Sequence, residues 1–452
     1  MPFARQIRDW LARQRAHSRF SMRRIPFSES REWSFEGGRI VHRTGRFFSI
    51  DGLRATSRFP GLEAWEQPII DQPEIGILGF LAQRRRGVWR LLVQAKTEPG
   101  NEGVVQLAPT LQATASNQGR VHRGREPAYL DLFADRPHER DVVDQLQSEQ
   151  GSRFLRKRNR NLVVVLPPGE ELTHDESFRW LSVCELLGLL RLDHAVNTDC
   201  RSVLSCLPVS LLEEDEELRG ARGCASGFDA ALAASLRAGE DLACEPKGRI
   251  RAWLTDQRRR YGLRVERLPL GALSGWRVDP DAVRPNAPGL FSVVQVDVCA
   301  GDREVERWDQ PIVESADPGL VALLCQVRRG LLHFLVQARV EPGAFDVLEL
   351  TATVQCAPGD HSPLELERLH PFAALVLGTP PEWVRFENQQ TEEGGRFLRD
   401  ATRYVVVELP EAESVCPPDN YRWLTLGQIK GLLRFSNVFT NEARSLIACL
   451  LR

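Results

Sequence analysis

The sequence predicts an α+β protein that consists of two tandem copies of one module. The first observation is an internal repeat, because "LLVQAKTEPGN" at 91–101 returns as "FLVQARVEPGA" at 334–344. The second is that one offset of 243 residues aligns almost the whole of both halves. The third is mixed periodicity, in which helical spacing near the start and the end of each half flanks a middle section of alternating strands.

The internal repeat covers both halves without a gap. The offset of 243 residues places "WEQPII" from Trp65 on "WDQPIV" from Trp308. It also places "SRFLR" at 152–156 on "GRFLR" at 395–399. A period of this length is far too long for a solenoid, so the repeat indicates duplication of a whole domain. With 452 residues, the chain has ample length for two such domains.

Three segments follow from the repeat. We expect a first module over residues 1–209, a helical connector over residues 210–247 and a second module over residues 248–452. The connector contains the acidic run "EEDEEL" and the Ala-rich stretch "FDAALAASLRAGEDL". Runs of like charge usually form the solvated face of a helix, so we expect this segment to bridge the modules on the surface.

Each module is expected to open with a helix and to contain strands in its middle. The stretch "ARQIRDWLARQRAH" at 4–17 has amphipathic helical spacing, and "WLSVCELLGLLR" at 180–191 predicts a late helix that begins with Trp180. Apolar and polar residues alternate before the turn, as in a strand. Pro99 and Gly100 suit the centre of a type II turn, which leads into a returning strand at 104–114.

Composition excludes several classes of protein. Hydrophobic residues make up 42% and charged residues 27%, which argues against disorder and against a membrane protein. A net charge of −2 gives no field for bulk binding of nucleic acid or membrane. The N-terminus lacks the pattern of a signal peptide, and no apolar run is long enough to span a bilayer. The ten scattered cysteines predict reduced thiols in a cytoplasmic protein, and no HExxH or similar cluster indicates a metal.

A polar face on the repeated hairpin is the first candidate for a binding site. Uncharged polar residues on the expected strands accompany one lysine; they are Gln94, Gln106, Thr110 and Gln112, with Lys96. One interpretation is plain solvent exposure. The other is a hydrogen-bonding surface for a sugar or a nucleotide, since exposed strands more often carry Lys and Glu at such positions.

The repeated stretches resemble the NDP-hexose 2,3-dehydratases of deoxysugar biosynthesis. The resemblance is carried by "LVQAKTEPGN", "VQLAPTLQATASN", "LQSEQGSRFLRKRNRN" and "FRWLSVCELLGLL", with the second-half partners "LVQARVEPG", "ELTATVQC", "ENQQTEEGGRFLR" and "YRWLTLGQIKGLL". It implies a homodimer whose subunits each contain two modules of Nudix-like topology, with a mixed sheet flanked by helices. The Nudix hydrolase signature itself is absent, so no pyrophosphatase activity is implied.

The resemblance also implies a lyase that converts a dTDP-4-keto-6-deoxyhexose to the dTDP-3,4-diketo-2,6-dideoxyhexose. A ketone at carbon 4 acidifies the hydrogen on carbon 3, and the 2-hydroxyl is then placed for loss through the enolate. Such a reaction needs a base, a donor for the developing oxyanion and an acid for the departing hydroxyl. It requires neither a redox cofactor nor a metal, so we expect no cofactor. The alternative is a non-catalytic protein whose two modules bind nucleotide sugars.

Residues present only in the first copy are the candidates for chemistry. Four positions that change in the second copy are Lys96, His122, Tyr129 and Asp131, replaced by Arg339, Glu365, Phe372 and Ala374. We therefore place the active site in the first module and a non-catalytic ligand site in the second; drift after duplication is the alternative. Lys96 could polarise the ketone oxygen, and Glu98 or Asp131 could be the base. Tyr129 or His122 could protonate the leaving hydroxyl, while Glu98 could instead only cap its turn.

The remaining candidates are assigned to binding. The arginines of "RFLRKRNRN" recur in both copies, and guanidinium groups suit the oxygens of a diphosphate. A solvated strand edge is the alternative, and the slightly acidic chain argues against a nucleic-acid patch. Trp180 is a candidate for base stacking, although a core position is more common. The full set for substrate binding is Gln94, Asn101, Gln106, Thr110, Gln112, Asn117, Gln147, Arg153, Arg156, Arg160 and Trp180. The expected second ligand site contains Gln337, Arg339, Glu341, Thr353, Gln355, Arg396, Arg399 and Arg403.

Overall fold

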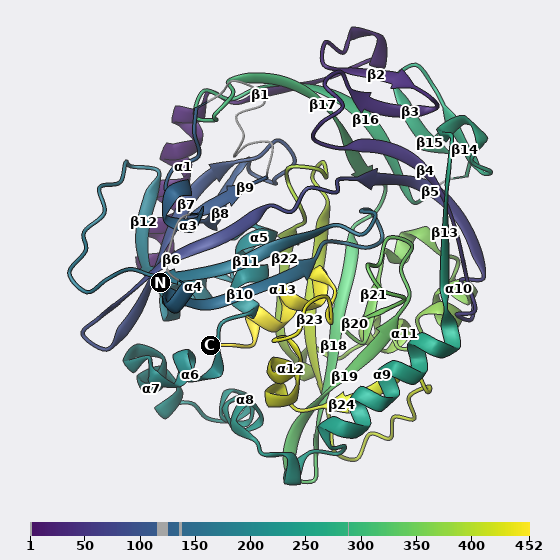
Figure 1. Ribbon diagram of the computed structural model, residues 1–452. Coiled ribbons are helices and arrows are strands. Elements are labelled where there is room, and N and C mark those ends of the chain that lie inside the picture. The colour runs from purple at the N-terminus through teal and green to yellow at the C-terminus, as the bar shows by residue number, and fades with distance from the viewer. Residues whose placement is uncertain (1, 115–124, 135–137, 288) are drawn as a thin grey trace.

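The chain forms a mixed α+β molecule with four sheets (Figure 1). The computed structural model describes residues 2–114, 125–134, 138–287 and 289–452. Two sheets have seven strands each, and two smaller sheets have five strands each. The α+β class predicted from the sequence is confirmed, and the two halves have a similar order of elements.

Each half begins with a long helix, continues with strands and ends with short helices. The first half contains α1 (Pro2–Ser18), β1 (Ser21–Ile25), β2 (Trp33–Glu36), β3 (Arg39–His42), β4 (Ser49–Ser57), β5 (Ala64–Asp71), β6 (Ile77–Arg85), β7 (Val88–Thr97), β8 (Val105–Pro109), β9 (Leu111–Ala113), α3 (Leu130–Ala134), β10 (Asp141–Ser148), β11 (Arg158–Val165), β12 (Phe178–Ser182), α4 (Val183–Leu189) and α5 (Thr198–Ser205). The connecting segment contains α6 (Val209–Glu214), α7 (Glu216–Gly223) and α8 (Phe228–Arg237). The second half contains α9 (Lys247–Tyr261), β13 (Leu263–Leu268), β14 (Trp276–Val278), β15 (Ala282–Pro285), β16 (Phe291–Cys299), β17 (Arg307–Ser315), β18 (Gly319–Arg328), β19 (Leu331–Arg339), β20 (Glu349–Thr351), β21 (Val354–Cys356), α10 (Pro363–Leu369), α11 (Ala373–Leu377), β22 (Val384–Thr391), β23 (Ala401–Leu409), β24 (Tyr421–Leu424), α12 (Leu426–Leu432) and α13 (Asn441–Cys449).

The seven-stranded sheets have the same topology in both halves. In the first half the order is β10-β11-β6-β7-β12, with β8 beside β7 and β9 beside β6. In the second half the order is β22-β23-β18-β19-β24, with β20 beside β19 and β21 beside β18. One pair in each sheet is parallel, namely β6 with β11 and β18 with β23. One face of each sheet contributes to a shared hydrophobic core that includes Leu204 of α5 and Leu446 of α13.

The two smaller sheets exchange their first strands between the halves. Strand β1 of the first half pairs antiparallel with β16 of the second, with Ser21 opposite Cys299. Reciprocally, β13 of the second half pairs antiparallel with β4 of the first, with Leu263 opposite Ser57. Figure 1 shows β13 running from α9 to the sheet of β4 and β5. The halves are therefore interlocked, because each small sheet contains a strand of the other half.

A local two-fold relation joins the halves, and two residue pairs lie on its axis. The Thr198 hydroxyl donates to Asn441 Oδ1 at 2.9 Å, and the ring centroids of Phe154 and Phe397 are 5.6 Å apart. In both pairs the second residue is the copy of the first, 243 positions later. A residue can touch its own copy only where the axis passes between them. Helices α5 and α13 pack together at this axis.

The predicted N-terminal helix is present as α1 and is confirmed. Its residues Ile7 and Trp10 are buried, and Trp10 Nε1 donates to the carbonyl of Glu176 at 2.8 Å. In the copy α9, Trp253 Nε1 donates to the carbonyl of Asp419 at 2.8 Å. The apolar stripe of α1 packs against β7 and β8, so the helix covers the seven-stranded sheet of its own half.

The late helix begins after Trp180, so the placement of Trp180 in a helix is wrong. Trp180 lies on strand β12, opposite Leu92 of β7. Helix α4 starts after Ser182, whose hydroxyl accepts from the Glu185 N–H while the Glu185 carboxylate accepts from the Ser182 N–H. This capping box fixes the start of the helix, and the apolar residues before it extend the sheet instead.

The repeated hairpin differs from the expected one in two respects. The Asn101 N–H donates to the Glu98 carbonyl at 3.3 Å, which confirms a turn over these residues. Gly100 lacks the positive φ of a type II turn; it is required because a Cβ there would lie 1.6 Å from the Phe397 carbonyl oxygen. The returning strand is split into β8, which pairs with β7, and β9, which pairs with β6.

The connector contains three helices, and its acidic run is only partly solvated. Asp215 in this run is fully buried. Its carboxylate accepts from the Trp89 N–H at 2.7 Å and from the Leu218 N–H at 2.9 Å. The expected solvated face is therefore interrupted, because Asp215 caps α7 and fastens the connector to β7.

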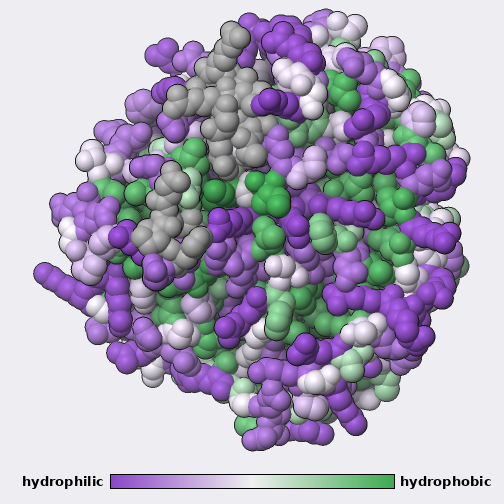
Figure 2. All heavy atoms as spheres, in the orientation of Figure 1, coloured by the Kyte–Doolittle hydropathy of each residue, from purple (hydrophilic) through white to green (hydrophobic). Residues whose placement is uncertain are grey.

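Polar residues dominate the visible surface of the molecule. In the orientation of Figure 2, hydrophilic residues cover most of the face, and hydrophobic residues form smaller areas between them. Across the described ranges, no helix combines the length and the apolar character needed to cross a membrane.

Candidate active site

Two cavities are formed by residues of both halves. The first consists of an inner chamber of about 110 Å³ and an outer recess of about 740 Å³. These parts adjoin, because five residues line both; they are Glu98, Thr114, Arg303, Gly395 and Arg396. Loops of the two halves therefore form one site with a wide outer part and a narrow inner part.

Glu98 lies where the chamber meets the recess, and three amide groups hold its buried carboxylate. Gln112 Nε2 donates to Oε1 at 2.7 Å. Asn101 Nδ2 and Asn197 Nδ2 donate to Oε2 at 3.1 and 3.3 Å. These neutral donors fix the position of the carboxylate without offsetting its charge.

Lys96 is a buried cation of the inner chamber. Its residue is 6% exposed, at the end of strand β7. Burial lowers the pKa of the ammonium group and the Arg303 guanidinium lowers it further, while Glu304, Glu98 and Asp199 oppose the shift. A buried lysine with a lowered pKa in a polar cavity is typical of functional sites.

Three further carboxylates line the inner chamber or its wall. Glu149, Asp199 and Glu393 each offer one oxygen, and these oxygens lie within 4.8 Å of one another. Glu149 accepts from Asn159 Nδ2 and from Asn441 Nδ2, both at 2.7 Å. Burial raises the pKa of all three carboxyl groups. This spacing would also suit a cation.

Protein cations surround these carboxylates. Lys157 donates to the Glu74 carbonyl, and burial lowers its pKa to about 8 against the opposing effect of Glu149. Arg396 is also buried, which lowers its pKa, and Glu393 opposes that shift. These side chains supply the positive charge that a bound metal ion would otherwise supply.

Aromatic rings line the outer recess. Trp33 and Phe48 have ring centroids 4.5 Å apart, and His42 and Phe47 have centroids 4.6 Å apart. Trp308 of the second half completes the lining. Flat aromatic faces of this kind suit a nucleobase, since every base offers a face for stacking.

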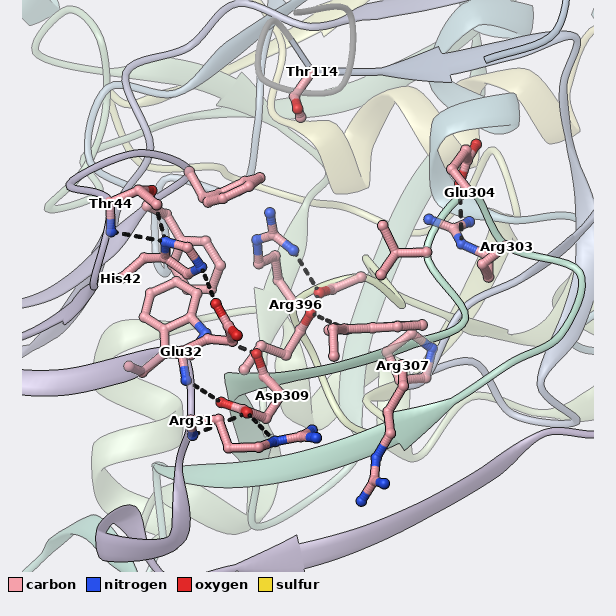
Figure 3. Close-up of a pocket in the computed structure, with 18 of the residues that line it drawn as sticks. Arg31, Glu32, His42, Thr44, Thr114, Arg303, Glu304, Arg307, Asp309 and Arg396 are labelled. Carbon is pink, nitrogen blue, oxygen red and sulfur yellow. Dashed lines mark hydrogen bonds and ion pairs between the residues drawn. The ribbon is translucent and has the colours of Figure 1, made fainter. Parts of the chain in front are cut away.

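Arginines lie between the aromatic rings and the inner chamber. Figure 3 shows Arg396 near the centre of the recess, with His42 on one side and Arg303 on the other. The Arg396 guanidinium lies 4.2 Å from the centroid of Phe48. Arg303 Nη1 donates to the Thr97 carbonyl at 3.1 Å, which fastens the β16–β17 hairpin of the second half to the first half. Guanidinium groups in this position suit the oxygens of a diphosphate.

The second cavity is the counterpart of the inner chamber and is larger than it, with a volume of about 180 Å³ against about 110 Å³. It is lined by Arg339, Glu341 and Gln355 of the second half, together with Gln150 and Arg153 of the first half. The offset of the repeat makes these residues the copies of Lys96, Glu98, Gln112, Glu393 and Arg396. The second cavity therefore has Arg in place of Lys and Gln in place of Glu.

Four residues predicted from the sequence meet at the first cavity or hold its walls. Lys96, Glu98 and Gln112 line the inner chamber. Asn101 donates to Glu98 from behind. Gln94 lies with Lys96 on a neighbouring depression of about 370 Å³. The hairpin thus brings these side chains together because they are close in sequence.

Other predicted binding residues line neither cavity. The hydroxyl of Thr110 bridges backbone groups of β6 and β7, and that of Thr353 bridges β18 and β19. Gln106 donates to a threonine of the second half at 2.9 Å, and Gln147 donates to a carbonyl of the second half at 3.2 Å. Gln337 is buried in β19. The structure places these residues in the sheets and at the contact between the halves.

Two arginines lie at the opposite cavity from the one expected. Arg153 was expected in the first site and Arg396 in the second, whereas Arg153 lines the second cavity and Arg396 the first. Arg153 lies 4.1 Å from the ring centroid of Phe291. The reason is that the loops after β10 and β22 cross to the other half, where the Gly343 N–H donates to the Gly151 carbonyl at 2.7 Å.

The remaining arginines of the repeated cluster lie at the surface. The side chains of Arg156 and Arg399 are exposed, and only their backbone N–H groups bond across the halves. Arg160 forms an ion pair with Asp144 at 2.5 Å, and Arg403 pairs in the same way on the second sheet. These four side chains line neither cavity.

The other candidates for chemistry lie apart from the first cavity or outside the described residues. Tyr129 and Trp180 are partly buried against an apolar cluster on one face of the first seven-stranded sheet. Asp131 is exposed in the first turn of α3. His122 and Asn117 lie outside the described residues.

Five charged residues of the inner chamber were not among the candidates from the sequence; they are Glu149, Lys157, Asp199, Arg303 and Glu393. The offset carries a signal for Glu393, whose copy Gln150 has lost the charge. It carries no signal for Asp199, since its copy Glu442 is also acidic. A comparison of the two copies could therefore have identified Glu393, because Glu393 is charged and its copy in the first half is not.

Comparison with known proteins gives a consistent result for both halves. A family model described as NDP-hexose 2,3-dehydratase matches residues 4–207 and again residues 247–450. A dTDP-4-dehydro-6-deoxy-alpha-D-glucopyranose 2,3-dehydratase of Saccharopolyspora spinosa is 41% identical over 446 residues, which cover 98% of this chain and 90% of the relative. Proteins of the same name from Amycolatopsis orientalis and Streptomyces violaceoruber are 40% and 39% identical, over 98% and 97% of this chain and 89% and 95% of the relatives.

Proposed function

Because this chain belongs to the NDP-hexose 2,3-dehydratase family, we propose that its first cavity removes water across carbons 2 and 3 of a dTDP-4-keto-6-deoxyhexose. The product is the dTDP-3,4-diketo-2,6-dideoxyhexose. The relatives from three organisms are named for dehydration of a dTDP-4-dehydro-6-deoxy-glucopyranose, and they match this chain over nearly its whole length.

One structural observation carries the proposal beyond family membership. A wide aromatic recess, rimmed by arginines, adjoins a narrow polar chamber that contains a buried lysine and several carboxylates. A dTDP-sugar has the same order of parts, namely an aromatic base, a charged diphosphate and a polar hexose. The cavity therefore has aromatic, positively charged and polar surfaces in the same order as the base, the diphosphate and the hexose of the substrate.

The match supports one orientation for the substrate. Thymine stacks among Trp33, Phe48 and Trp308, and the diphosphate lies against Arg303 and Arg396. The hexose then enters the inner chamber. The second half supplies Trp308, Arg303 and Arg396, so the proposed active site is shared between the halves.

Glu98 is the proposed base and Lys96 the proposed electrophile. Glu98 lines the inner chamber and is held in position by three neutral amides, which places its carboxylate to take the hydrogen on carbon 3. Lys96 is the buried cation that can stabilise the oxyanion on carbon 4. Glu98 replaces Asp131 as the preferred base because Asp131 is exposed on α3.

The second cavity is proposed to be a non-catalytic ligand site. Its carboxylate Glu341 is held by the Arg339 guanidinium at 3.2 Å as well as by Gln355. An arginine partner offsets the charge that a base needs. The aromatic histidine of the first recess, His42, has Pro285 as its copy, which reduces the lining for a base.

The proposal extends to topology, assembly and location. Each module has Nudix-like topology, which is supported by a mixed sheet with one parallel pair and helices on its face. The protein acts as a homodimer, as the family resemblance implies, and no nucleic acid or membrane takes part. Cytoplasmic location is supported by the ten cysteines, all of which are free thiols in the described chain.

The test is a direct assay of the purified protein. Incubation with dTDP-4-keto-6-deoxyglucose should give a product whose mass is lower by one water, with loss of the 2-hydroxyl detected by NMR. Saturable binding of the substrate with no turnover would favour the alternative of a non-catalytic nucleotide-sugar-binding protein. An absence of both would contradict the proposal.

A further inference from the structure

The dehydration proposed above needs an acid for the departing 2-hydroxyl, and we propose that the carboxyl pair Asp199–Glu393 supplies this proton. The inference rests on the proposed function. Asp199 lies in the first turn of α5, and Glu393 lies in the loop that follows β22 of the second half. Both line the inner chamber together with Glu98 and Lys96.

The two carboxyl groups are placed to share a proton, because two carboxyl oxygens can hydrogen-bond to each other only when one of them is protonated. Their oxygens lie within 4.8 Å of each other and of a Glu149 oxygen. Negative charges at this spacing repel, which favours a proton on one of the carboxyl groups, while the nearby Arg396 opposes that effect. Burial raises the pKa of both groups, which agrees with a proton held near neutral pH.

Asp199 has a buried oxygen that lacks a donor. Its Oδ1 accepts no hydrogen bond from an N–H or hydroxyl group of the described residues, and the residue is only 2% exposed. A buried carboxylate oxygen without a donor is costly, and a proton shared with the neighbouring carboxyl group would remove that cost. Asp199 also lines the inner chamber, into which the hexose is proposed to enter.

Glu149 is unsuited to the same role. Both of its oxygens accept from amides, one from Asn159 and the other from Asn441, at 2.7 Å. These bonds occupy both oxygens and hold Glu149 in the wall of the chamber. A negative charge on Glu149 would favour a proton on its two neighbours.

The second cavity lacks the pair. Gln150 occupies the position of Glu393, and its Nε2 donates to Glu392 Oε2 at 3.3 Å. An amide can hold a hydrogen bond but cannot transfer a proton at neutral pH. The positions of Asp199 and Glu393 are therefore occupied in the second cavity by Glu442 and Gln150.

The proposed step balances in atoms and electrons. Glu98 takes the proton of carbon 3, and the electrons of that bond form the enolate with the oxygen on carbon 4. When the carbonyl re-forms, a double bond forms between carbons 2 and 3 and the bond from carbon 2 to oxygen breaks. The departing oxygen keeps the electron pair and takes the proton of the carboxyl pair, which gives water. The enol then gains a proton at carbon 2 and loses one from the 3-hydroxyl.

The test separates proton removal at carbon 3 from loss of the 2-hydroxyl. Glu393→Gln gives the first cavity the amide that the second one has. Turnover of the 2-hydroxy substrate should fall by roughly 100-fold, the scale of a lost general acid. Exchange of the carbon-3 hydrogen with solvent deuterium should continue, because Glu98 is intact. A 2-deoxy-2-fluoro analogue should react within a few fold of the unmodified rate, since fluoride needs much less acid assistance.

Control variants separate loss of the acid from general damage to the protein. Glu387→Gln makes the same acid-to-amide change on the outer part of β22, where Glu387 pairs with Arg403, and should leave all three rates unchanged. Asp199→Asn should repeat the pattern of Glu393→Gln, and melting temperatures report on folding. If Glu393→Gln fails to fold, Asp199→Asn decides the question.

Two outcomes would overturn the inference. One is turnover by Glu393→Gln and Asp199→Asn within a few fold of the unmodified rate. The other is loss of deuterium exchange and of fluoride release in folded variants, which would assign the pair to the first step. Failure of the unmodified protein to convert either substrate would instead contradict the proposed function, and the two failures are therefore distinguishable.

Discussion

At the scale of single residues, Glu98 and its copy Glu341 show how one residue type acquires two sets of surroundings. Glu98 accepts hydrogen bonds from three neutral amides. Glu341 accepts from Gln355 and from Arg339, at 3.0 and 3.2 Å. A guanidinium partner offsets the charge of a carboxylate, which neutral amides do not. Both copies thus have a glutamate at this position, and they differ in the side chains that donate hydrogen bonds to it.

The first prediction compares these two glutamates. Glu98→Gln should lower kcat by roughly 100-fold or more, because the general base is lost. Glu341→Gln should change kcat by no more than a few fold. Steady-state kinetics with melting temperatures would measure both. Loss of turnover in a folded Glu341→Gln protein, with Glu98→Gln active, would place the active site in the second cavity.

A second prediction concerns Arg396, which lies between the aromatic recess and the inner chamber. Arg396→Ala should raise KM by about 10-fold or more, since a hydrogen bond to a charged group contributes about 1.5–3 kcal/mol. The effect on kcat should be smaller, because a diphosphate contact is equal in the ground and transition states. Arg153→Ala makes the same change at the second cavity, and comparable loss of affinity there would refute the assignment of the two arginines.

A third prediction concerns Glu349, the copy of Gln106, which is buried where Ser148 of the other half donates to it at 2.6 Å. Burial raises its pKa from 4.5 to about 8. Between these values the unfolded chain releases a proton that the native protein keeps, so native stability falls as pH rises, by at most about 1.4 kcal/mol per pH unit. Glu349→Gln should remove this contribution.

The measurement is urea denaturation of the Glu349→Gln variant and the unmodified protein at pH 5 and pH 8. The variant should gain free energy of unfolding relative to the unmodified protein as the pH rises. An equal dependence on pH in both proteins would mean that Glu349 titrates at its ordinary value when folded.

At the scale of elements, the features that could be predicted are those whose signals are local. The stripe with Ile7 and Trp10 specifies α1, and the turn at Glu98 is specified by the proline and glycine that follow. The apolar run after Trp180 suits both a strand and a helix, and only the capping box at Ser182 separates them. Long-range pairing has no such local signal.

The exchange of β1 and β13 shows why pairing was not predicted. The two strands are copies of each other, and a strand needs the same alternation whether it pairs with its own half or with the other. The same limit applies to the site. Lys96, Glu98 and Gln112 lie on one hairpin and could be found together, whereas Glu393 and Arg396 reach the cavity on a loop that crosses between the halves.

The fourth prediction tests that crossing. Gly100→Ala should destabilise the protein by at least about 3 kcal/mol, because the new Cβ would lie 1.6 Å from the Phe397 carbonyl oxygen and must displace the loop. Gly220→Ala is the matched change in α7, where no atom lies within 4 Å of the new Cβ, and it should be neutral or stabilising by up to about 1 kcal/mol. Chemical denaturation compares the two, and a tolerant Gly100 would mean that the loops can separate.

At the scale of the whole molecule, two kinds of connection hold the halves together. One is covalent, through the connector at 210–247. The other is the pair of exchanged strands, together with the buried contacts of α5 and α13 at the axis. The exchanged strands form backbone hydrogen bonds in both small sheets, so these contacts persist when the connector is cut.

The fifth prediction is that a nicked chain stays assembled and active. A protease site inserted between Ala225 and Ser226, in the exposed segment before α8, allows cleavage after folding. Gel filtration of the cut protein should give one peak that contains both fragments, with kcat within a few fold of the uncut value. Separation of the fragments without denaturant would show that the connector alone holds the halves.

The exchanged strands also bear on how the two cavities could diverge. The contacts between the halves are those of a symmetric pair of identical chains, and in such a pair every substitution enters both sites at once. When one gene encodes both copies, the two positions can change independently. Position 393 can then have an acid while position 150 has an amide. Each half then serves partly as a scaffold for its neighbour's chemistry. Fusion of the two copies thus allowed one site to specialise in catalysis, while the other kept its part in stabilising the fold.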